Sequence, residues 1–313
     1  MASSQTFTIA NGGVAPDLTI SSIVSGSATL TKAGTGELTL SNANTFTGGV
    51  TLNAGTLNIN NSSALGTIAG TFTINGGVID NTTGALITTV NYPQSWNGDF
   101  TFTGTRSLNL GNGVVTPNAN RQLTINGNTL TVGGAIGGGA ISLTKLGAAG
   151  TLTLSGSNGF SGGLIINAGT VQLGNAGALN SGTPNAVTFG AASTGRLQLN
   201  GNSVTISGLN TNVAVGTPIV ENLAGGAATL TVSTSGSDNY GGANLRAQRG
   251  GTHSHILEFS AECAPPPIQY QDPGEEEIDS IEESISASLV SGTRIHAHPI
   301  KLRLTKCFSS RCS

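Results

Sequence analysis

Residues 30–66 read LTKAGTGELTLSNANTFTGGVTLNAGTLNINNSSALG, and residues 143–180 repeat that string as LTKLGAAGTLTLSGSNGFSGGLIINAGTVQLGNAGALN, with one inserted residue near Ala149. Both copies consist of short alternating segments separated by glycine and asparagine. Internal repetition of this kind indicates a repeat architecture, in which each unit buries its apolar face only against its neighbours. We therefore expect the function to lie on an extended surface and not in a catalytic pocket.

Apolar residues recur at every second position within each copy, which is the pattern of strands with one buried face. Thr39, Thr51 and Asn58 fall between them. The apolar positions expected in the core are Leu38, Leu40, Leu52, Leu57, Ile59, Leu152, Leu154, Ile166, Val171 and Leu173. Matched residues such as Asn44 and Asn158 or Gly55 and Gly169 predict sharp turns, because glycine adopts positive φ without steric cost and asparagine tolerates it. A chain that turns in this way coil after coil forms a solenoid.

The composition supports an all-β fold. The 313 residues include 47 Gly, and only 9% are charged, compared with roughly 25% in ordinary globular domains. Thr and Asn take the place of the Glu, Lys, Arg and Ala that cover exposed helix faces, so we expect no helix before about residue 275. The net charge of −3 gives no electrostatic argument for binding nucleic acid or an anionic membrane.

Five motifs stand in the same order in both copies: L-T-K-x-G, T/E-L-T-L-S, N-x-F-x-G-G, N-A-G-T-L/V and a closing A-L. Through them the chain resembles the autotransporter-associated β-strand repeat, or passenger-associated transport repeat, of bacterial passengers. Residues 94–113 and 123–145 look like the spacer coils of such proteins, so the resemblance covers roughly residues 1–243. It implies a right-handed parallel β-helix, export to the extracellular space or the Gram-negative cell surface, and a barrel translocator elsewhere in the full-length protein.

Two features of an exported autotransporter are not expected within this sequence. The opening MASSQTFTIA lacks the positive n-region and long apolar core of a secretory signal. Aromatic residues make up 4% of the chain, which is too few for the aromatic girdles of an outer-membrane barrel. We interpret residues 1–243 as part of a longer passenger.

The composition changes at residue 244. Residues 244–313 hold 16 of the 27 charged residues, all four His and all three Cys, but only four Gly. One interpretation is a Pro-rich linker followed by a short acidic helix at 275–290, with Ile278, Ile281, Ile285 and Leu289 at helical spacing. The other is translation in a different reading frame past about Ala243. Both predict an irregular, partly disordered tail.

The tail also holds the residues that favour metal binding by type. They are His253, His255, His296, His298, Cys263, Cys307 and Cys312. Their spacing does not match structural zinc sites, which usually show C-x₂₋₄-C or H-x₃₋₅-H pairs. Three thiols also leave one unpaired, which argues against a disulfide framework. We predict no metal, no cofactor and no catalytic residue.

An enzyme is the main alternative, because parallel β-helices also carry polysaccharide lyases and hydrolases. Such chemistry needs carboxylates converging in a groove, with a base or a cation. The acids of residues 1–243 are Asp17, Glu37, Asp80, Asp99, Glu221 and Asp238. Asp80 and Asp99 are nineteen residues apart in sequence, close to one coil, so they are the pair with a chance to stack. Solvated turn residues remain the simpler explanation.

Threonine suggests a third function, ice binding, because outward T-x-T ladders on a β-helix form an ice-binding surface when they lie in register. The pairs are Thr6/Thr8, Thr29/Thr31, Thr71/Thr73, Thr101/Thr103, Thr129/Thr131, Thr151/Thr153 and Thr229/Thr231. Threonine is also common at exposed strand positions for reasons of β-propensity. Our prediction is therefore a non-enzymatic structural stalk or adhesive surface, whose repeat aids secretion and folding and whose partners are surface glycans or proteins.

Overall fold

The computed structural model describes residues 1–223, 226–234, 238–242, 247–250 and 254–259. The chain divides into two units, residues 1–261 and 262–313, and all of the described residues lie in the first. The regular elements among them are strands, with no helix. This confirms the all-β class, and the short acidic helix expected at 275–290 lies outside the described residues.

Most of the strands form three parallel sheets, which we call faces A, B and C. Face A consists of β1 (Gln5–Thr8), β3 (Leu30–Ala33), β5 (Val50–Leu52), β7 (Phe72–Ile74), β10 (Gln94–Trp96) and β13 (Val115–Pro117). Face B consists of β2 (Leu18–Ile20), β4 (Glu37–Leu40), β6 (Thr56–Ile59), β8 (Val78–Asp80), β11 (Phe100–Phe102), β14 (Arg121–Ile125), β16 (Leu143–Leu146), β18 (Leu164–Ile166), β20 (Ala186–Phe189) and β23 (Gly208–Thr211). Face C consists of β9 (Ile87–Thr88), β12 (Leu108–Asn109), β15 (Thr129–Val132), β17 (Thr151–Leu154), β19 (Thr170–Leu173), β21 (Arg196–Gln198) and β24 (Ile219–Glu221).

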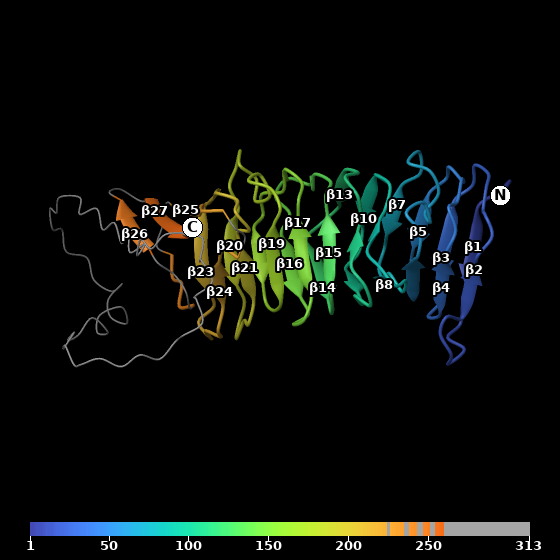
Figure 1. Cartoon of the computed structure of the whole chain (residues 1–313), viewed down its shortest axis with the longest axis horizontal. Helices are drawn as coiled ribbons and strands as arrows, with labels where there is room; N and C mark the ends of the chain where they lie inside the picture. Colours follow the sequence, from blue (N-terminus) through green and yellow to red (C-terminus); the bar gives the residue numbers. More distant parts are fainter. Residues whose placement is uncertain (224–225, 235–237, 243–246, 251–253, 260–313) are drawn as a thin grey trace, which may run out of the picture. The chain divides into compact units, whose positions relative to one another are not determined.

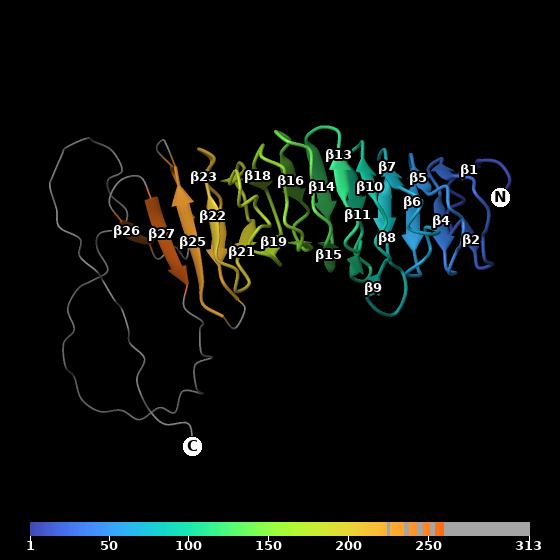
Figure 2. The same cartoon turned by 90° about the horizontal axis from the view of Figure 1, so that it is seen from above.

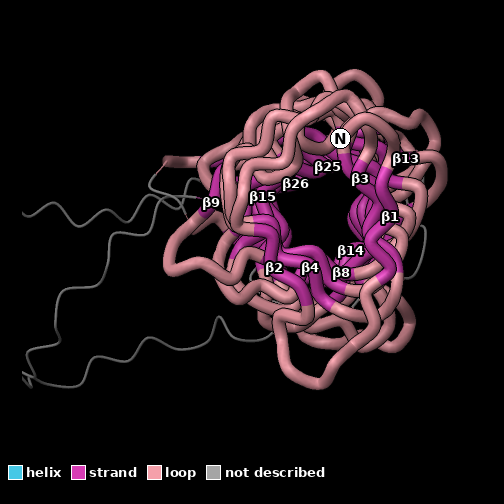
Figure 3. Tube along the Cα trace, turned by 90° about the vertical axis from the view of Figure 1, so that its right-hand side faces the viewer, coloured by secondary structure: helices cyan, strands magenta, loops and turns pink. Residues whose placement is uncertain are grey.

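The chain visits the faces in turn, so that neighbouring strands of one face are one coil apart. Register partners on face B are separated by as few as 19 residues, from Leu38 to Leu57, and by as many as 23, from Ile79 to Phe102. The coils lie side by side along one axis from β1 to β25 in both long views (Figures 1 and 2). Seen along that axis, the strands surround the centre and the loops lie outside them (Figure 3). The ten strands of face B correspond to about ten coils and confirm the solenoid that the repeats predict.

The core is a set of apolar columns inside the ring of strands. All ten residues expected there are buried, with at most 1% of the side chain exposed. Leu38 pairs with Leu57, which pairs with Ile79, and on face C Leu152 pairs with Val171, which pairs with Leu197. Each apolar side chain therefore packs against its counterparts one coil before and one coil after, as the period-two pattern predicts.

Two polar residues between the apolar positions are also buried. Thr39 is 5% and Asn58 is 1% exposed, although they alternate with inward-facing leucines. Asn58 lies between Thr39 and Asp80 in the register of face B, and its amide nitrogen donates to Thr39 Oγ1 at 2.9 Å and to Glu37 Oε1. Stacking of polar side chains one coil apart thus excludes water from part of the outer surface.

The two copies of the repeat lie on different faces. In the first copy LTKA is β3 on face A and ELTL is β4 on face B, whereas in the second copy LTKL is β16 on face B and TLTL is β17 on face C. The same motif is thus built twice, in two different surroundings around the axis.

A fourth sheet follows the last coils. It consists of β22 (Val204–Ile206), β25 (Ala228–Ser233), β27 (Ser254–Phe259) and β26 (Ala247–Gly250). β22 and β25 are parallel, but β27 pairs antiparallel with β25 and with β26. The sequence does not predict the two strands β26 and β27 after residue 244, where it predicts an irregular tail.

Candidate functional site

Each repeat buries one lysine. Lys32 and Lys145 are both 0% exposed. Lys32 Nζ donates to the carbonyls of Ala33 and Gly34 at 2.9 Å and to that of Ala54, in the next coil, at 3.0 Å. Each ammonium proton therefore has one acceptor, so the charged group is buried without an unsatisfied donor.

The second copy reproduces these contacts. Lys145 Nζ donates to the carbonyls of Leu146 at 2.8 Å and Gly147 at 2.7 Å, and to that of Ala168, in the next coil, at 3.1 Å. Burial lowers the pKa of Lys145 to about 8. Burial also lowers the pKa of Lys32, against the opposing effect of the Asp17 carboxylate.

A buried asparagine joins three coils in each copy. Asn44 Oδ1 accepts from the main-chain N–H of Val24, one coil earlier, and Asn44 Nδ2 donates to the carbonyl of Ala64, one coil later. Asn158 makes the equivalent bonds with Ile136 and Ala178, at 2.8 and 2.7 Å. Both asparagines lie between strands, as expected, but neither has the positive φ on which that expectation rested. Their amides instead bridge main-chain groups of the neighbouring coils.

The two carboxylates that had a chance to stack are not brought together. Asp80 aligns with Asn58 on one side, and the register of β8 with β11 places Asp99 several positions from it. Asp80 accepts from the main-chain N–H groups of Gly104 and Thr105 and from Thr105 Oγ1. Asp99 accepts from Arg121 at 3.3 Å and from the N–H of Gln122 at 2.9 Å.

The remaining acids also contact neighbouring coils. Asp17 accepts from the N–H groups of Gly12 and Glu37, and these hydrogen bonds lower its pKa. Glu37 accepts from Asn58, and Asp238 accepts from Asn210 Nδ2 at 3.0 Å. Each of these carboxylates has its own partners, and among the residues that the structure describes no three His, Cys, Asp or Glu side chains are grouped to hold a metal.

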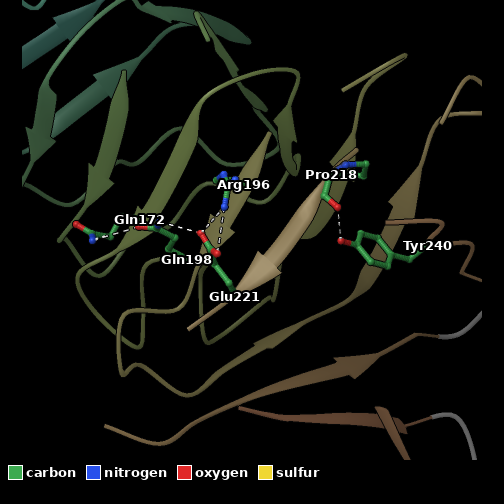
Figure 4. A network of polar contacts seen from close by, with 6 residues as sticks. All are labelled: Gln172, Arg196, Gln198, Pro218, Glu221 and Tyr240. Carbon is green, nitrogen blue, oxygen red and sulfur yellow. Dashed lines mark hydrogen bonds and ion pairs between the residues drawn. The ribbon is translucent and has the colours of Figure 1, made fainter. Parts of the chain in front are cut away.

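Face C carries an outward polar row at the last coils. Thr153, Gln172, Gln198 and Glu221 are register partners. Gln172 donates to Gln198 at 3.4 Å, Gln198 donates to Glu221 at 2.9 Å, and Arg196 forms an ion pair with Glu221 at 3.2 Å (Figure 4).

Nearby, Tyr240 donates to the carbonyl of Pro218 at 3.0 Å (Figure 4). Its ring packs on that of Phe189. Burial raises the pKa of Tyr240. Contacts between neighbouring coils therefore continue up to Tyr240.

Face A carries a row of hydroxyl groups. Its members are register partners, each half-buried or exposed: Thr6, Thr31, Thr51, Thr73, Ser95 and Thr116. The T-x-T pairs themselves are scattered over the faces. Thr129/Thr131 and Thr151/Thr153 face each other in register, whereas Thr6 pairs with Thr31, so that the first two T-x-T pairs are offset by two residues.

The metal-ligating residue types of the tail cannot be assessed in the same way. His253, His296, His298, Cys263, Cys307 and Cys312 lie outside the described residues, and for His255 the structure describes only the main chain of β27. In the described part of the chain, no helix has the length and apolar character needed to cross a bilayer.

Comparison with known proteins agrees with this architecture. A family model described as passenger-associated-transport-repeat matches residues 30–59 and 143–173, which are β3 to β6 and β16 to β19. The Adhesin BmaC autotransporter of Brucella suis biovar 1 (strain 1330) is 34% identical to the chain, over 72% of this chain and 8% of its own length. No solved structure matches significantly.

The chain thus carries two passenger-associated transport repeats on a parallel β-solenoid, and 72% of its length is similar to an autotransporter adhesin. These likenesses support a surface-exposed, outer-membrane-associated location. The chain spans about 8% of the length of the adhesin that it matches.

Proposed function

We propose that the chain is a non-enzymatic passenger solenoid that acts as a structural stalk or adhesive surface, and that its repeats aid secretion and folding of the passenger. The observation that carries the proposal is that two sets of side chains have different roles. Charged and amide groups of the repeats join one coil to the next, while hydroxyl and amide groups form outward rows that run over many coils. An adhesive surface spreads its contacts in this way, whereas an active site concentrates them.

The outward rows suit a polar partner. The face A row offers hydroxyl groups at successive coils, each able to donate and to accept a hydrogen bond. Strands one coil apart are about 4.8 Å apart, so the row presents hydrogen-bonding groups at a regular spacing. Surface glycans or proteins are therefore the partners that we propose, and the adhesin to which the chain is similar favours the same role.

The charges of the solenoid point to contacts that depend little on salt. Lys32 and Lys145 are buried, and Arg121 and Arg196 are paired with Asp99 and Glu221. The fifth basic side chain of residues 1–242, Arg106, is exposed and donates to the carbonyl of Thr105. Screening by salt weakens interactions between exposed charges and leaves neutral hydrogen bonds largely unchanged. Adhesion by the outward rows should therefore persist at high ionic strength.

A polysaccharide lyase or hydrolase remains the alternative. It is disfavoured by the separate partners of Asp80 and Asp99, since each carboxylate already accepts hydrogen bonds from its own neighbours and the two do not converge in one groove. Ice binding is the third candidate, and the offset between the T-x-T pairs of β1 and β3 disfavours it.

Adhesion of protein-coated beads to glycan arrays and to cultured epithelial cells tests the proposal. T51K/T73K places two charges in the face A row, and Q172K/Q198K serves as a matched pair in the face C row. We expect T51K/T73K to abolish adhesion and Q172K/Q198K to retain it, at both low and high salt. Release of sugar products that is lost in D80N or D99N would contradict the proposal and favour the enzyme.

A further inference from the structure

The buried lysine of each repeat sits in a site made entirely by the main chain. Two of its three carbonyls belong to the lysine's own coil and the third belongs to the NAG turn of the next coil. No hydrogen bond or ion pair joins either Nζ to a carboxylate in the part of the chain that the structure describes. The hydrogen-bond partners of each ammonium are therefore main-chain carbonyls, as they are in main-chain sites for monovalent cations.

Glycine builds this site at two positions. Gly34 and Gly147, which follow the lysines, have φ of +75° and +88°, and this left-handed turn directs their carbonyls toward Nζ. Gly55 and Gly169 lie in the next coil, where an added Cβ would stand 2.5 Å from the lysine Nζ. Only glycine lets the main chain of that coil approach the ammonium.

The two copies are independent evidence for one design. They lie on faces A and B, so different strands surround them, and yet donor, acceptors and distances agree within a few tenths of an ångström. Asp17 of the preceding coil acts on the charge of Lys32 alone. The geometry at Lys145 therefore does not depend on an acidic neighbour.

We propose that each repeat contains a three-carbonyl binding site for a primary ammonium between successive coils, and that the repeat's own lysine fills this site to hold the following coil in place. The site is complete only when the next coil has wound onto its predecessor, because the third carbonyl arrives with that coil. The inference goes beyond the adhesive or structural role, and holds whatever the surface binds.

Chemical rescue tests the ammonium site directly. K145A removes three methylene groups and the ammonium, a space that n-propylammonium fills in shape and charge, and L154A provides a matched apolar cavity in the same repeat. Urea unfolding of the whole chain is measured in n-propylammonium chloride and in tetramethylammonium chloride at equal concentration. We expect n-propylammonium to raise the midpoint of K145A selectively, with no such gain for L154A or the unsubstituted chain. Equal effects of the two salts on K145A, or an equal gain for L154A, would overturn the proposal.

A second variant covers the case in which K145A does not fold without rescue. K145M keeps the volume of the stem but removes the three donors, so the carbonyls of Leu146, Gly147 and Ala168 lose their partner. We expect hydrogen exchange of the amides at 167–173 to become at least ~10-fold faster in K145M, since buried unsatisfied groups cost more than one factor of ten in stability. If the amides at 167–173 exchanged as slowly in K145M as in the unsubstituted chain, the ammonium would not stabilise the following coil.

Discussion

At the scale of single residues, individual side chains connect the coils of this solenoid. Asn158 satisfies a main-chain N–H of the previous coil and a main-chain carbonyl of the next, and it is 5% exposed. Removing such a group leaves two buried polar atoms without partners. The side chains that join coils are therefore expected to be more sensitive to substitution than the outward rows.

We predict that Asn158→Ala lowers the free energy of unfolding by about 2–4 kcal/mol, because each buried orphan costs about 1–3 kcal/mol. Asn175→Ala is the control, since Oδ1 of Asn175 accepts only within its own turn, from the N–H of Gly177. Urea unfolding followed by circular dichroism measures both. Equal midpoints for the two variants would contradict the bridging role.

The free energy of unfolding should depend on pH through the titration of Lys145. Its pKa is about 8 in the fold against 10.5 in the unfolded chain, so between these values the unfolded chain binds more protons. Stability should therefore rise as the pH increases from about 8 to about 10. The free energy of unfolding of the unsubstituted chain and of K145M is measured with urea at each pH, and the difference between the two is plotted against pH. A difference that stays constant over this range would rule out titration of Lys145.

Much of the interior at the residue scale follows from the sequence pattern. The alternation that places Leu30 inside also places Lys32 inside, two positions later. The preference of lysine for water hides this signal, so the pattern alone did not predict a buried Lys32. Asn44 was interpreted as a turn residue because turns are the commonest use of asparagine, and its bridging role depends on main-chain groups twenty residues away in the chain.

At the scale of strands and turns, the close approach of neighbouring main chains limits which residues a turn can accommodate. The turn before β19 passes over Lys145 at Gly169, which has φ of +69°. Strands of two to six residues are too short to hold their register alone. The turns therefore fix which residues of successive strands meet.

We predict that Gly169→Ala destabilises the chain by more than about 2 kcal/mol, because the new Cβ is strained at positive φ and meets the carbonyl oxygens of Gly147 and Gly150 as well as the lysine ammonium. Gly84→Ala is the matched control, since a Cβ there meets nothing within 4 Å and surface substitutions usually change stability by less than about 0.5 kcal/mol. Thermal unfolding distinguishes the two. A Gly169→Ala variant as stable as Gly84→Ala would refute the close approach.

The sequence predicts the strands of the repeats better than their arrangement around the axis. Leu38 and Leu152 stand at equivalent places of the two copies, but they lie on faces B and C. The face depends on the summed lengths of all intervening coils, which vary from 19 to 23 residues, and local pattern does not contain that sum. β26 and β27 were missed for another reason, because the composition after residue 244 differs from that of the repeats.

Contacts between neighbouring coils account for the stability of the whole molecule. Each strand of face B pairs with the strands one coil before and after it. In such an architecture stability is approximately a sum of coil terms and nearest-neighbour terms. Removal of one complete coil should therefore leave the remaining columns intact.

We predict that deletion of residues 102–124 preserves the fold, because Ile125 then takes the place of its register partner Phe102. Deletion of residues 102–123 is the control, since a shift by one residue turns the alternating side chains to the opposite face. Circular dichroism and size-exclusion chromatography report the outcome. We expect a soluble β protein from the first deletion and aggregation from the second. Similar behaviour of the two would argue against the assigned register.

The central claim is that residues about one coil apart are neighbours on a continuous polar face, and disulfide trapping tests it most directly. Cysteines at Thr51 and Thr73, which are register partners on face A, are introduced in a chain whose three native cysteines are replaced by serine. The Cα atoms of neighbouring strands are close enough for a disulfide. We predict rapid oxidation to an intramolecular disulfide for the pair at 51 and 73, and none for a pair at 51 and 95, two coils apart. Bond formation in the second pair but not in the first would contradict the solenoid and the surface built on it.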